Sequence, residues 1–250
     1  MTPYFIDTPV PDLERLARPD WQVNKVIMRG GRPQERMLGL YKPLTKMVAR
    51  RAGQGGRPVS VAGDCCTTIA VLGGLQRAGL NPTLLWLDAH GDFNTWQTTP
   101  SNFLGGMPLA MLVGRGEQTL MDGLGVVPLP EEQVILTDAR DLNPGEREAV
   151  EGSAVHHLPH VVSLLNYDFP VRPLYIHFDT DLINPQEAPA MNYKTAGGPS
   201  VTMLRHIFHH LAATRRIVCV SLSSWNPQLD EDGRSREVCM ALLDELVGGA

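Results

Sequence analysis

The stretch PTLLWLDAHGDFN, residues 82–94, joins a continuous apolar run to polar side chains that recur at every second position. Such an apolar run is typical of a strand that is buried on both faces, as in a parallel sheet with helices on each side. The chain then places Asp88, His90 and Asp92 in alternation, so an extended backbone would direct all three to one face. The stretch predicts a buried parallel strand that ends in a polar cluster.

Segments that predict strands alternate with segments that predict helices along the chain. Apolar runs predict strands at 57–64, 82–90, 133–140, 173–182 and 215–227. Apolar spacing and capping residues predict helices at 66–80, 108–116, 144–152, 200–214 and 235–249. Residues 160–168 fit either a helix or a strand. The predicted fold class is therefore α/β, with a parallel sheet between layers of helices, and binding sites in such sheets lie at the carboxyl ends of the strands.

Length and composition limit the classes of protein. The 250 residues suit a single domain, residues 1–250, and 43% hydrophobic with 20% charged residues is ordinary for a globular chain. The net charge of −5 argues against binding to nucleic acid or to a membrane surface. The four cysteines, two of them adjacent, indicate reduced thiols. No apolar run reaches the ~18 residues of a membrane span and no signal peptide is evident, so we expect a cytoplasmic protein.

Acidic side chains gather at the predicted carboxyl ends of two strands. Asp179 and Asp181 repeat the alternation of Asp88, His90 and Asp92. Carboxylates that converge without a counter-charge repel one another and lose solvation, and divalent cations remove that penalty. So many ligands favour two metal ions, which together can hold a bridging hydroxide as a nucleophile. The alternative is that an Asp at a strand end only caps a helix or forms a turn.

With these residues in place, the chain resembles the arginase/agmatinase (ureohydrolase) family. The likeness is carried by GDCC (63–66), WLDAHGDFNTWQTTPSNFLGGMP (86–108), ARDLNPGE (139–146), HFDTDLINPQEAPA (177–190) and WNP (225–227). The resemblance implies a three-layer α/β/α arginase-like fold and two divalent metal ions, which in the family are Mn²⁺. It also implies that family members form homo-oligomers.

The resemblance assigns metal ligands residue by residue. Five positions match family ligands, with Asp88 and Asp179 as the bridging carboxylates, and these five are Asp88, His90, Asp92, Asp179 and Asp181. The sixth family ligand is a His, and Cys65 stands in its place. A thiolate is softer and favours Zn²⁺ or Fe²⁺ over Mn²⁺. The neighbouring His177 is an additional polar group that we expect to face the other side of its strand.

The resemblance also implies a pocket for a substrate with an amino-acid head group. Asn94 and Ser101 match positions that hold the α-carboxylate, whereas Asn143 and Glu146 match positions on the α-amino side. Tyr193 stands where arginases carry a small Thr.

Two other positions depart from arginases. Gly105 replaces a His that shuttles protons, and Ser224 replaces a Glu that faces the guanidinium. A neutral Ser cannot form a charge-assisted bond with a guanidinium. These departures favour a less basic substrate, and the chain has some likeness to the N-hydroxy-arginine amidinohydrolase branch.

The sequence thus predicts a hydrolase that cleaves a linear C–N bond of a guanidino or N-hydroxyguanidino amino acid by a metal-bridging hydroxide. Asp92 would both ligate metal and accept a hydrogen bond from that hydroxide. Two alternatives stay open. One is a formimino or amidine hydrolase of the same family, and the other is a catalytically silent, arginase-like binding subunit.

Overall fold

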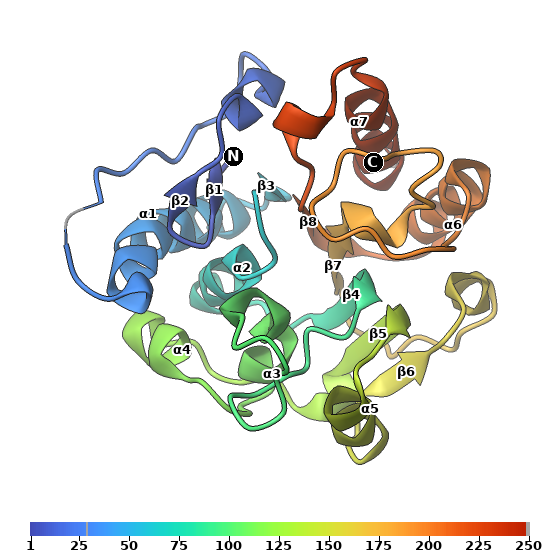
Figure 1. Ribbon diagram of the computed structural model, residues 1–250, viewed down its shortest axis with the longest axis horizontal. Coiled ribbons are helices and arrows are strands. Elements are labelled where there is room, and N and C mark those ends of the chain that lie inside the picture. The colour runs from blue at the N-terminus through green and yellow to red at the C-terminus, as the bar shows by residue number, and fades with distance from the viewer. Residues whose placement is uncertain (29, 249–250) are drawn as a thin grey trace.

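The computed structural model describes residues 1–28 and 30–248. Within these residues, six strands form one sheet in the order β3–β8–β7–β4–β5–β6, and every neighbouring pair is parallel. Figure 1 shows helices on both sides of this sheet. The predicted α/β class, with its parallel sheet and three layers, is confirmed. The strands are β3 Val59–Val61, β4 Thr83–His90, β5 Val134–Asp141, β6 His156–Leu158, β7 Leu174–Asp179 and β8 Ile217–Ser223.

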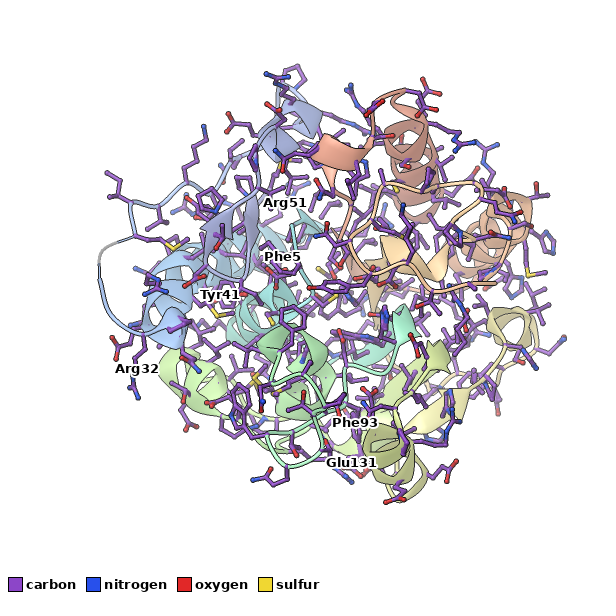
Figure 2. All side chains as sticks on the ribbon, in the orientation of Figure 1. Phe5, Arg32, Tyr41, Arg51, Phe93 and Glu131 are labelled. Carbon is purple, nitrogen blue, oxygen red and sulfur yellow. The ribbon has the colours of Figure 1, made fainter. Side chains whose placement is uncertain are left out.

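Two groups of helices cover the two faces of the sheet. One apolar cluster is built with side chains from α1 Pro33–Gly53, α2 Thr67–Arg77, α3 Pro108–Leu112 and α4 Thr119–Leu124. The other is built with side chains from α6 Val201–Thr214 and α7 Arg234–Val247. The short helix α5, Pro144–Glu151, follows β5. Figure 2 shows how side chains fill the space between these layers, with Tyr41 projecting from α1.

Shorter elements complete the chain. The hairpin strands β1 Tyr4–Phe5 and β2 Thr8–Pro9 pair with each other. The short 3₁₀ helices are η1 Leu13–Leu16, η2 Leu104–Gly106, η3 Glu131–Gln133, η4 Val161–Leu165, η5 Thr180–Leu182 and η6 Pro227–Leu229. No helix of the described residues is long and apolar enough to cross a bilayer.

The central strand β4 explains why both faces are buried. Leu84 and Trp86 pack into the cluster on one face, and Leu85 and Leu87 pack into the cluster on the other. Successive side chains of a strand point to opposite faces, so an uninterrupted apolar run supplies two cores at once. This is the arrangement predicted from the stretch at 82–94.

The predicted strands and helices are present at their expected places, and most of them are shorter than predicted. The helix predicted at 200–214 begins at Val201, and the Ser200 side chain accepts a hydrogen bond from the Met203 backbone N–H at 3.2 Å, as predicted for an N-cap. Residues 160–168, left open, contain the 3₁₀ helix η4. All four cysteines are free and buried.

Candidate metal centre

A cavity of about 350 Å³ opens at the carboxyl ends of the central strands. Every residue predicted for the site lines it, although these residues come from segments far apart in the chain. What each of them binds stays a prediction. The predicted residues that line the cavity are Cys65, Asp88, His90, Asp92, Asn94, Ser101, Asn143, Glu146, Asp179, Asp181, Tyr193 and Ser224.

Two groups of side chains at this end of the sheet could each hold a metal ion. In one group, ligand atoms of Asp88, His90 and Asp181 all lie within 4.8 Å of one another. The other group has the same spacing and consists of Cys65, Asp88, His177 and Asp179. Because Asp88 belongs to both groups, the two candidate positions are adjacent.

Asp88 and His90 are fixed by the end of β4. The Trp86 indole N–H donates to Asp88 Oδ2 at 3.2 Å, and the His90 backbone N–H donates to Asp88 Oδ1 at 2.8 Å. The His90 ring nitrogen Nδ1 lies 3.0 Å from Asp181 Oδ2 and 3.4 Å from Asp88 Oδ1. The ring therefore lies against both carboxylates.

The other nitrogen of the His90 ring also has partners, which were not predicted. Nε2 lies 3.3 Å from Thr195 Oγ1 and 3.9 Å from Asp141 Oδ2. Groups in this position set the orientation of a metal-binding imidazole. Thr195 lies in an irregular segment, and no motif in that segment predicts this contact.

Asp179 is surrounded by hydrogen-bond donors at the end of β7. The Cys65 thiol lies 2.7 Å from Asp179 Oδ2, and the Ser223 hydroxyl donates to the same oxygen at 3.0 Å. The Ser224 hydroxyl also donates to it. Asp179 Oδ1 accepts from the Asp181 backbone N–H at 2.8 Å and so caps η5. The helix-capping alternative is thus true of Asp179, and its second oxygen still faces the cluster.

The expectation for His177 is wrong. It lies two residues before Asp179 on β7, and side chains two apart on a strand share a face. The His177 ring accordingly groups with Cys65, Asp88 and Asp179. Burial lowers the pKa of His177 to about 3, so the ring is neutral.

Burial, and after it the charge of neighbouring acids, raises the pKa values of the carboxyl groups. Burial, and after it the charge of Asp181, raises the pKa of Asp179 to about 7. Burial, and after it the charge of Asp88, raises the pKa of Asp181 to about 6. Burial opposes a charge on His90, but the Asp181 and Asp88 carboxylates outweigh it and raise the pKa of His90 to about 12. The cluster therefore attracts positive charge.

Asp92 has an unfavourable backbone conformation and a buried carboxyl oxygen without a hydrogen-bond partner in the described chain. Its backbone carbonyl accepts from the Leu109 and Ala110 N–H groups at 3.0 and 3.1 Å, which ties it to the start of α3. Its φ of 49° lies in the left-handed region, and its Oδ2 is buried without a hydrogen-bond partner in the described chain. Burial, followed by the charge of Asp88, raises the pKa of Asp92 well above its usual value.

These observations test whether the residues fit divalent metal ions. An orphaned carboxylate oxygen, crowded acids with raised pKa values and imidazole groups beside them are the features that a bound dication would satisfy. The thiol of Cys65 is a softer donor within hydrogen-bond range of Asp179. The set of donors fits two dications.

A polar network lines the cavity beside the acids. The Asn143 amide donates to Asn94 Oδ1 at 3.1 Å and to Glu146 Oε2 at 3.2 Å. Asn143 also caps α5, since its side-chain oxygen accepts from the Glu146 backbone N–H at 3.1 Å. Glu146 is buried, and its Oε1 accepts from the Phe93 backbone N–H at 2.9 Å. The network therefore holds a carboxylate and two amides at fixed positions in the wall.

Three aromatic rings stand together at the cavity. Phe5 stacks on Phe103 at 5.9 Å between ring centroids, and Tyr193 lies 5.5 Å from Phe103 and 6.3 Å from Phe5. Phe103 also explains the glycine nearby, because a Cβ atom on Gly105 would lie 2.3 Å from Phe103 Cζ. Phe5 was not predicted, since it belongs to the N-terminal hairpin, where no motif was recognised.

The two serines predicted to bind substrate differ in their surroundings. Ser101 is exposed, and its hydroxyl accepts from the Phe103 backbone N–H at 3.3 Å. Ser224 is half-buried with a left-handed φ of 71°, and its hydroxyl is engaged with Asp179.

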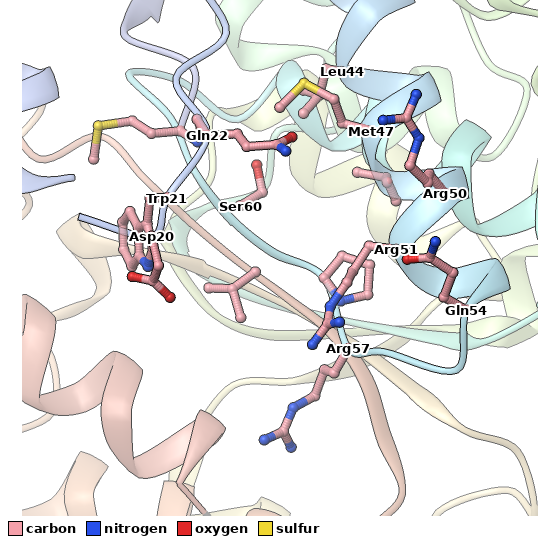
Figure 3. Close-up of a pocket in the computed structure, with 14 residues that line it drawn as sticks. Asp20, Trp21, Gln22, Leu44, Met47, Arg50, Arg51, Gln54, Arg57 and Ser60 are labelled. Atoms are coloured by element: carbon pink, nitrogen blue, oxygen red, sulfur yellow. Dashed lines mark hydrogen bonds between the residues drawn. The ribbon is translucent and has the colours of Figure 1, made fainter. Parts of the chain in front are cut away.

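A second cavity, of about 510 Å³, lies next to the beginning of β3. Figure 3 shows that its side chains include Arg50, Arg51, Arg57 and Asp20. The Arg57 guanidinium donates to the Val247 carbonyl. Among the described residues, neither candidate metal group lies at this cavity, so the smaller one is the candidate site.

Proteins similar to this chain in sequence or in fold include arginases. A model of the Arginase family matches residues 18–248. The arginase of Bacillus subtilis is 28% identical over 203 residues, which cover 76% of this chain and 69% of the relative. The N(omega)-hydroxy-L-arginine amidinohydrolase of Streptomyces lavendulae is 30% identical over 189 residues, 74% of this chain and 66% of the relative. The solved structure of an arginase from Bacillus caldovelox has a TM-score of 0.81 at 23% identity, covering 99% of this chain and 96% of that one.

Proposed function

This chain belongs to the arginase family of hydrolases, and we propose that it cleaves a linear C–N bond of a guanidino or N-hydroxyguanidino amino acid. One observation carries the proposal. Two adjacent groups of metal-ligand atoms share Asp88, and they open onto the same cavity as the Asn94, Asn143 and Glu146 network. A metal centre and a polar wall of this kind suit a small polar substrate.

The proposed metal ligands are Cys65, Asp88, His90, Asp92, Asp179 and Asp181. Two dications bound there would activate a water molecule as the nucleophile, and their positive charge would also stabilise the negative charge that develops as water attacks the central carbon. Asp92 would hold the attacking water, because Asp92 Oδ2 is an acceptor with no other partner in the described chain. Water adds to the central carbon, the C–N bond breaks, and the products are an amine and urea, or hydroxyurea from an N-hydroxylated substrate.

The polar network would hold the amino-acid end of the substrate. Glu146 offers a carboxylate to an α-amino group, and the Asn94 and Asn143 amides are already oriented by their mutual hydrogen bond. Ser101 lies at the exposed edge of the cavity, where its hydroxyl can reach an α-carboxylate. Tyr193 lines the same cavity as part of the aromatic group.

Ser224 and Gly105 support a weakly basic substrate. No carboxylate stands at Ser224 to pair with a guanidinium, and the hydroxyl there is engaged with Asp179. A charge-assisted bond of this kind is worth about 1.5–3 kcal/mol. An N-hydroxyguanidine carries less charge and would lose less from its absence.

A substrate screen tests the proposal. Guanidino and N-hydroxyguanidino amino acids would be incubated with protein loaded with Mn²⁺, Zn²⁺ or Fe²⁺, and urea or hydroxyurea would be measured. We expect turnover of the N-hydroxylated substrate to exceed that of arginine, with Cys65→His as the comparison for the first metal position. Arginine turnover at the higher rate would contradict the preference for a modified substrate.

Two other functions are separated by further measurements. An amidine hydrolase of the same family would keep its activity on small amidines in Asn94→Ala and Ser101→Ala variants, whereas an amino-acid hydrolase would lose turnover. A silent binding subunit is the other alternative that the departures at Cys65, Gly105 and Ser224 leave open, and it would contain no metal by elemental analysis. A cytoplasmic location and a homo-oligomer without nucleic-acid or membrane partners stay predictions.

A further inference from the structure

His177 is a buried imidazole with one unused nitrogen. Its exposed fraction is 0%, and its Nδ1 lies 3.0 Å from the Ser221 hydroxyl. Its Nε2 is buried without any hydrogen-bond partner in the described chain. Leaving a buried polar atom unpaired is unfavourable, so the free nitrogen needs an explanation.

The ring is held in place from two sides. Trp86 lies directly opposite His177 in the pairing of β4 with β7, and the two ring centroids are 4.0 Å apart. Ser221 on β8 approaches from the other neighbouring strand. Trp86, which lies against His177, also donates a hydrogen bond to Asp88, so the imidazole and the acids share a neighbour.

The ring belongs to the group of ligand atoms that includes Cys65, which we call the first metal position. A ring nitrogen of His177, Cys65 Sγ and one oxygen each of Asp88 and Asp179 lie within 4.8 Å of one another. Because Nδ1 is engaged with Ser221 and Nε2 has no partner in the described chain, we infer that Nε2 is the ligand atom. The arrangement supplies one sulfur, one imidazole and two carboxylates from three separate segments, a set of four that suits a tetrahedral ion.

We propose that His177 and Cys65 together hold the first metal ion, through Nε2 and Sγ, and that this position takes Zn²⁺ in preference to Mn²⁺. The inference rests on the proposed function in assuming that the centre binds metal. On binding, Cys65 loses its thiol proton to solvent and ligates as the thiolate. His177 of β7 would thus supply an imidazole in place of the family His that Cys65 replaces.

The second position differs in kind. Asp88, His90 and Asp181 offer only carboxylate and imidazole ligands. Oxygen and nitrogen ligands suit Mn²⁺, whereas thiolate favours Zn²⁺. The two positions should therefore differ in their preference between Zn²⁺ and Mn²⁺.

Metal titration of the His177→Gln variant tests the inference without reference to activity. Wild-type protein should bind two Zn²⁺ per chain, and its Co²⁺ form should show thiolate-to-metal absorption. His177→Gln should weaken one of the two Zn²⁺ positions by about 10-fold or more and leave the other unchanged. His209→Gln, in an exposed helical residue, is the matched control and should bind as wild type does.

X-ray absorption of the wild-type protein with one equivalent of Zn²⁺ covers the case in which His177→Gln does not fold. One sulfur and one imidazole ligand are expected, and Cys65→Ser should remove the sulfur alone. Unchanged Zn²⁺ affinity in a folded His177→Gln variant, or a first equivalent without imidazole, would overturn the inference. Wild type that binds two Zn²⁺ but hydrolyses nothing would reject the proposed function alone, and wild type without bound metal would reject both.

Discussion

At the scale of single residues, Asp92 combines three features that oppose folding. Its carboxyl is buried, its Oδ2 lacks a partner in the described chain, and its backbone has a φ of 49°. Each is unfavourable by itself, and such features collect at functional sites because selection there is for reactivity rather than for stability. The same residue is the one to which we assign the attacking water.

Asp92→Asn should therefore stabilise the metal-free protein while removing its activity. The amide has nearly the same shape, carries no charge and tolerates a left-handed backbone. We expect the free energy of unfolding in chelator, measured by denaturant titration at mildly alkaline pH, to rise by about 0.5–2 kcal/mol. The exposed Asp232→Asn is the control and should change neither stability nor turnover. A less stable Asp92→Asn protein would show that the carboxylate helps to hold the metal-free fold.

Gly105 lies in close contact with the ring of Phe103. A Cβ on Gly105 would lie 2.3 Å from Phe103 Cζ, so the glycine makes room for the aromatic ring. Gly105→His should consequently lower the free energy of unfolding by about 1–3 kcal/mol through overpacking. In a double-mutant cycle with Phe103→Ala, the coupling should exceed about 0.5 kcal/mol, because removing the ring removes the clash.

Gly106 gives the matched control for that cycle. A Cβ on Gly106 meets nothing within 4 Å, so Gly106→Ala should show no coupling to Phe103→Ala. Additive effects of Gly105→His and Phe103→Ala would mean that the ring moves aside freely. In that case the missing His would not be explained by packing.

At the scale of elements, α1 and α2 approach each other closely through a glycine. A Cβ on Gly74 of α2 would lie 2.5 Å from Val48 Cβ and 2.8 Å from the Thr45 carbonyl oxygen, both on α1. These contacts include backbone, which cannot move aside as a flexible side chain can.

Gly74→Ala should therefore destabilise the protein by about 1–3 kcal/mol, although alanine is the better helix former. Gly39 of α1 is exposed and meets nothing within 4 Å, so Gly39→Ala should instead stabilise by up to about 1 kcal/mol. Thermal melts of the two variants compare the effects directly. Stabilisation by Gly74→Ala would show that the two helices can separate at little cost.

Some helices and strands could be predicted from the sequence, and others could not. The strand β4 was evident because burial on both faces requires an uninterrupted apolar run. The helix α1 was missed although Met37, Leu40, Tyr41, Leu44 and Val48 are buried at helical spacing. Pro43 inside the helix and the charged residues around it obscure that pattern, since proline removes a helical hydrogen bond. The three-residue strand β6 is too short to show any periodicity.

At the scale of the whole molecule, most of the candidate site could be located because parallel strands bring their carboxyl ends to one edge. Strand-end residues such as Asp88, Asp179 and Ser224 followed from that rule together with the family motifs. Phe5 and Thr195 did not, because they reach the site through irregular segments whose path depends on packing elsewhere. His177 was misjudged only because the alternation along β7 was not applied to it.

Protons and metal ions compete for the same carboxyl groups. This competition predicts how the stability of the whole molecule depends on pH. The pKa of Asp179 is raised to about 7 and that of Asp181 to about 6, so their protonated forms stabilise the metal-free fold. That contribution is complete below the pKa of the unfolded chain and is lost as the pH rises through about 6 to 7. A dication binds only the deprotonated groups, so the increase in melting temperature on adding Zn²⁺ should grow as the pH rises from about 5 to about 7.5. Asp181→Asn removes one titrating group and should flatten the dependence. An increase that is equal or larger at the lower pH would mean that these carboxyl groups are not where the metal binds.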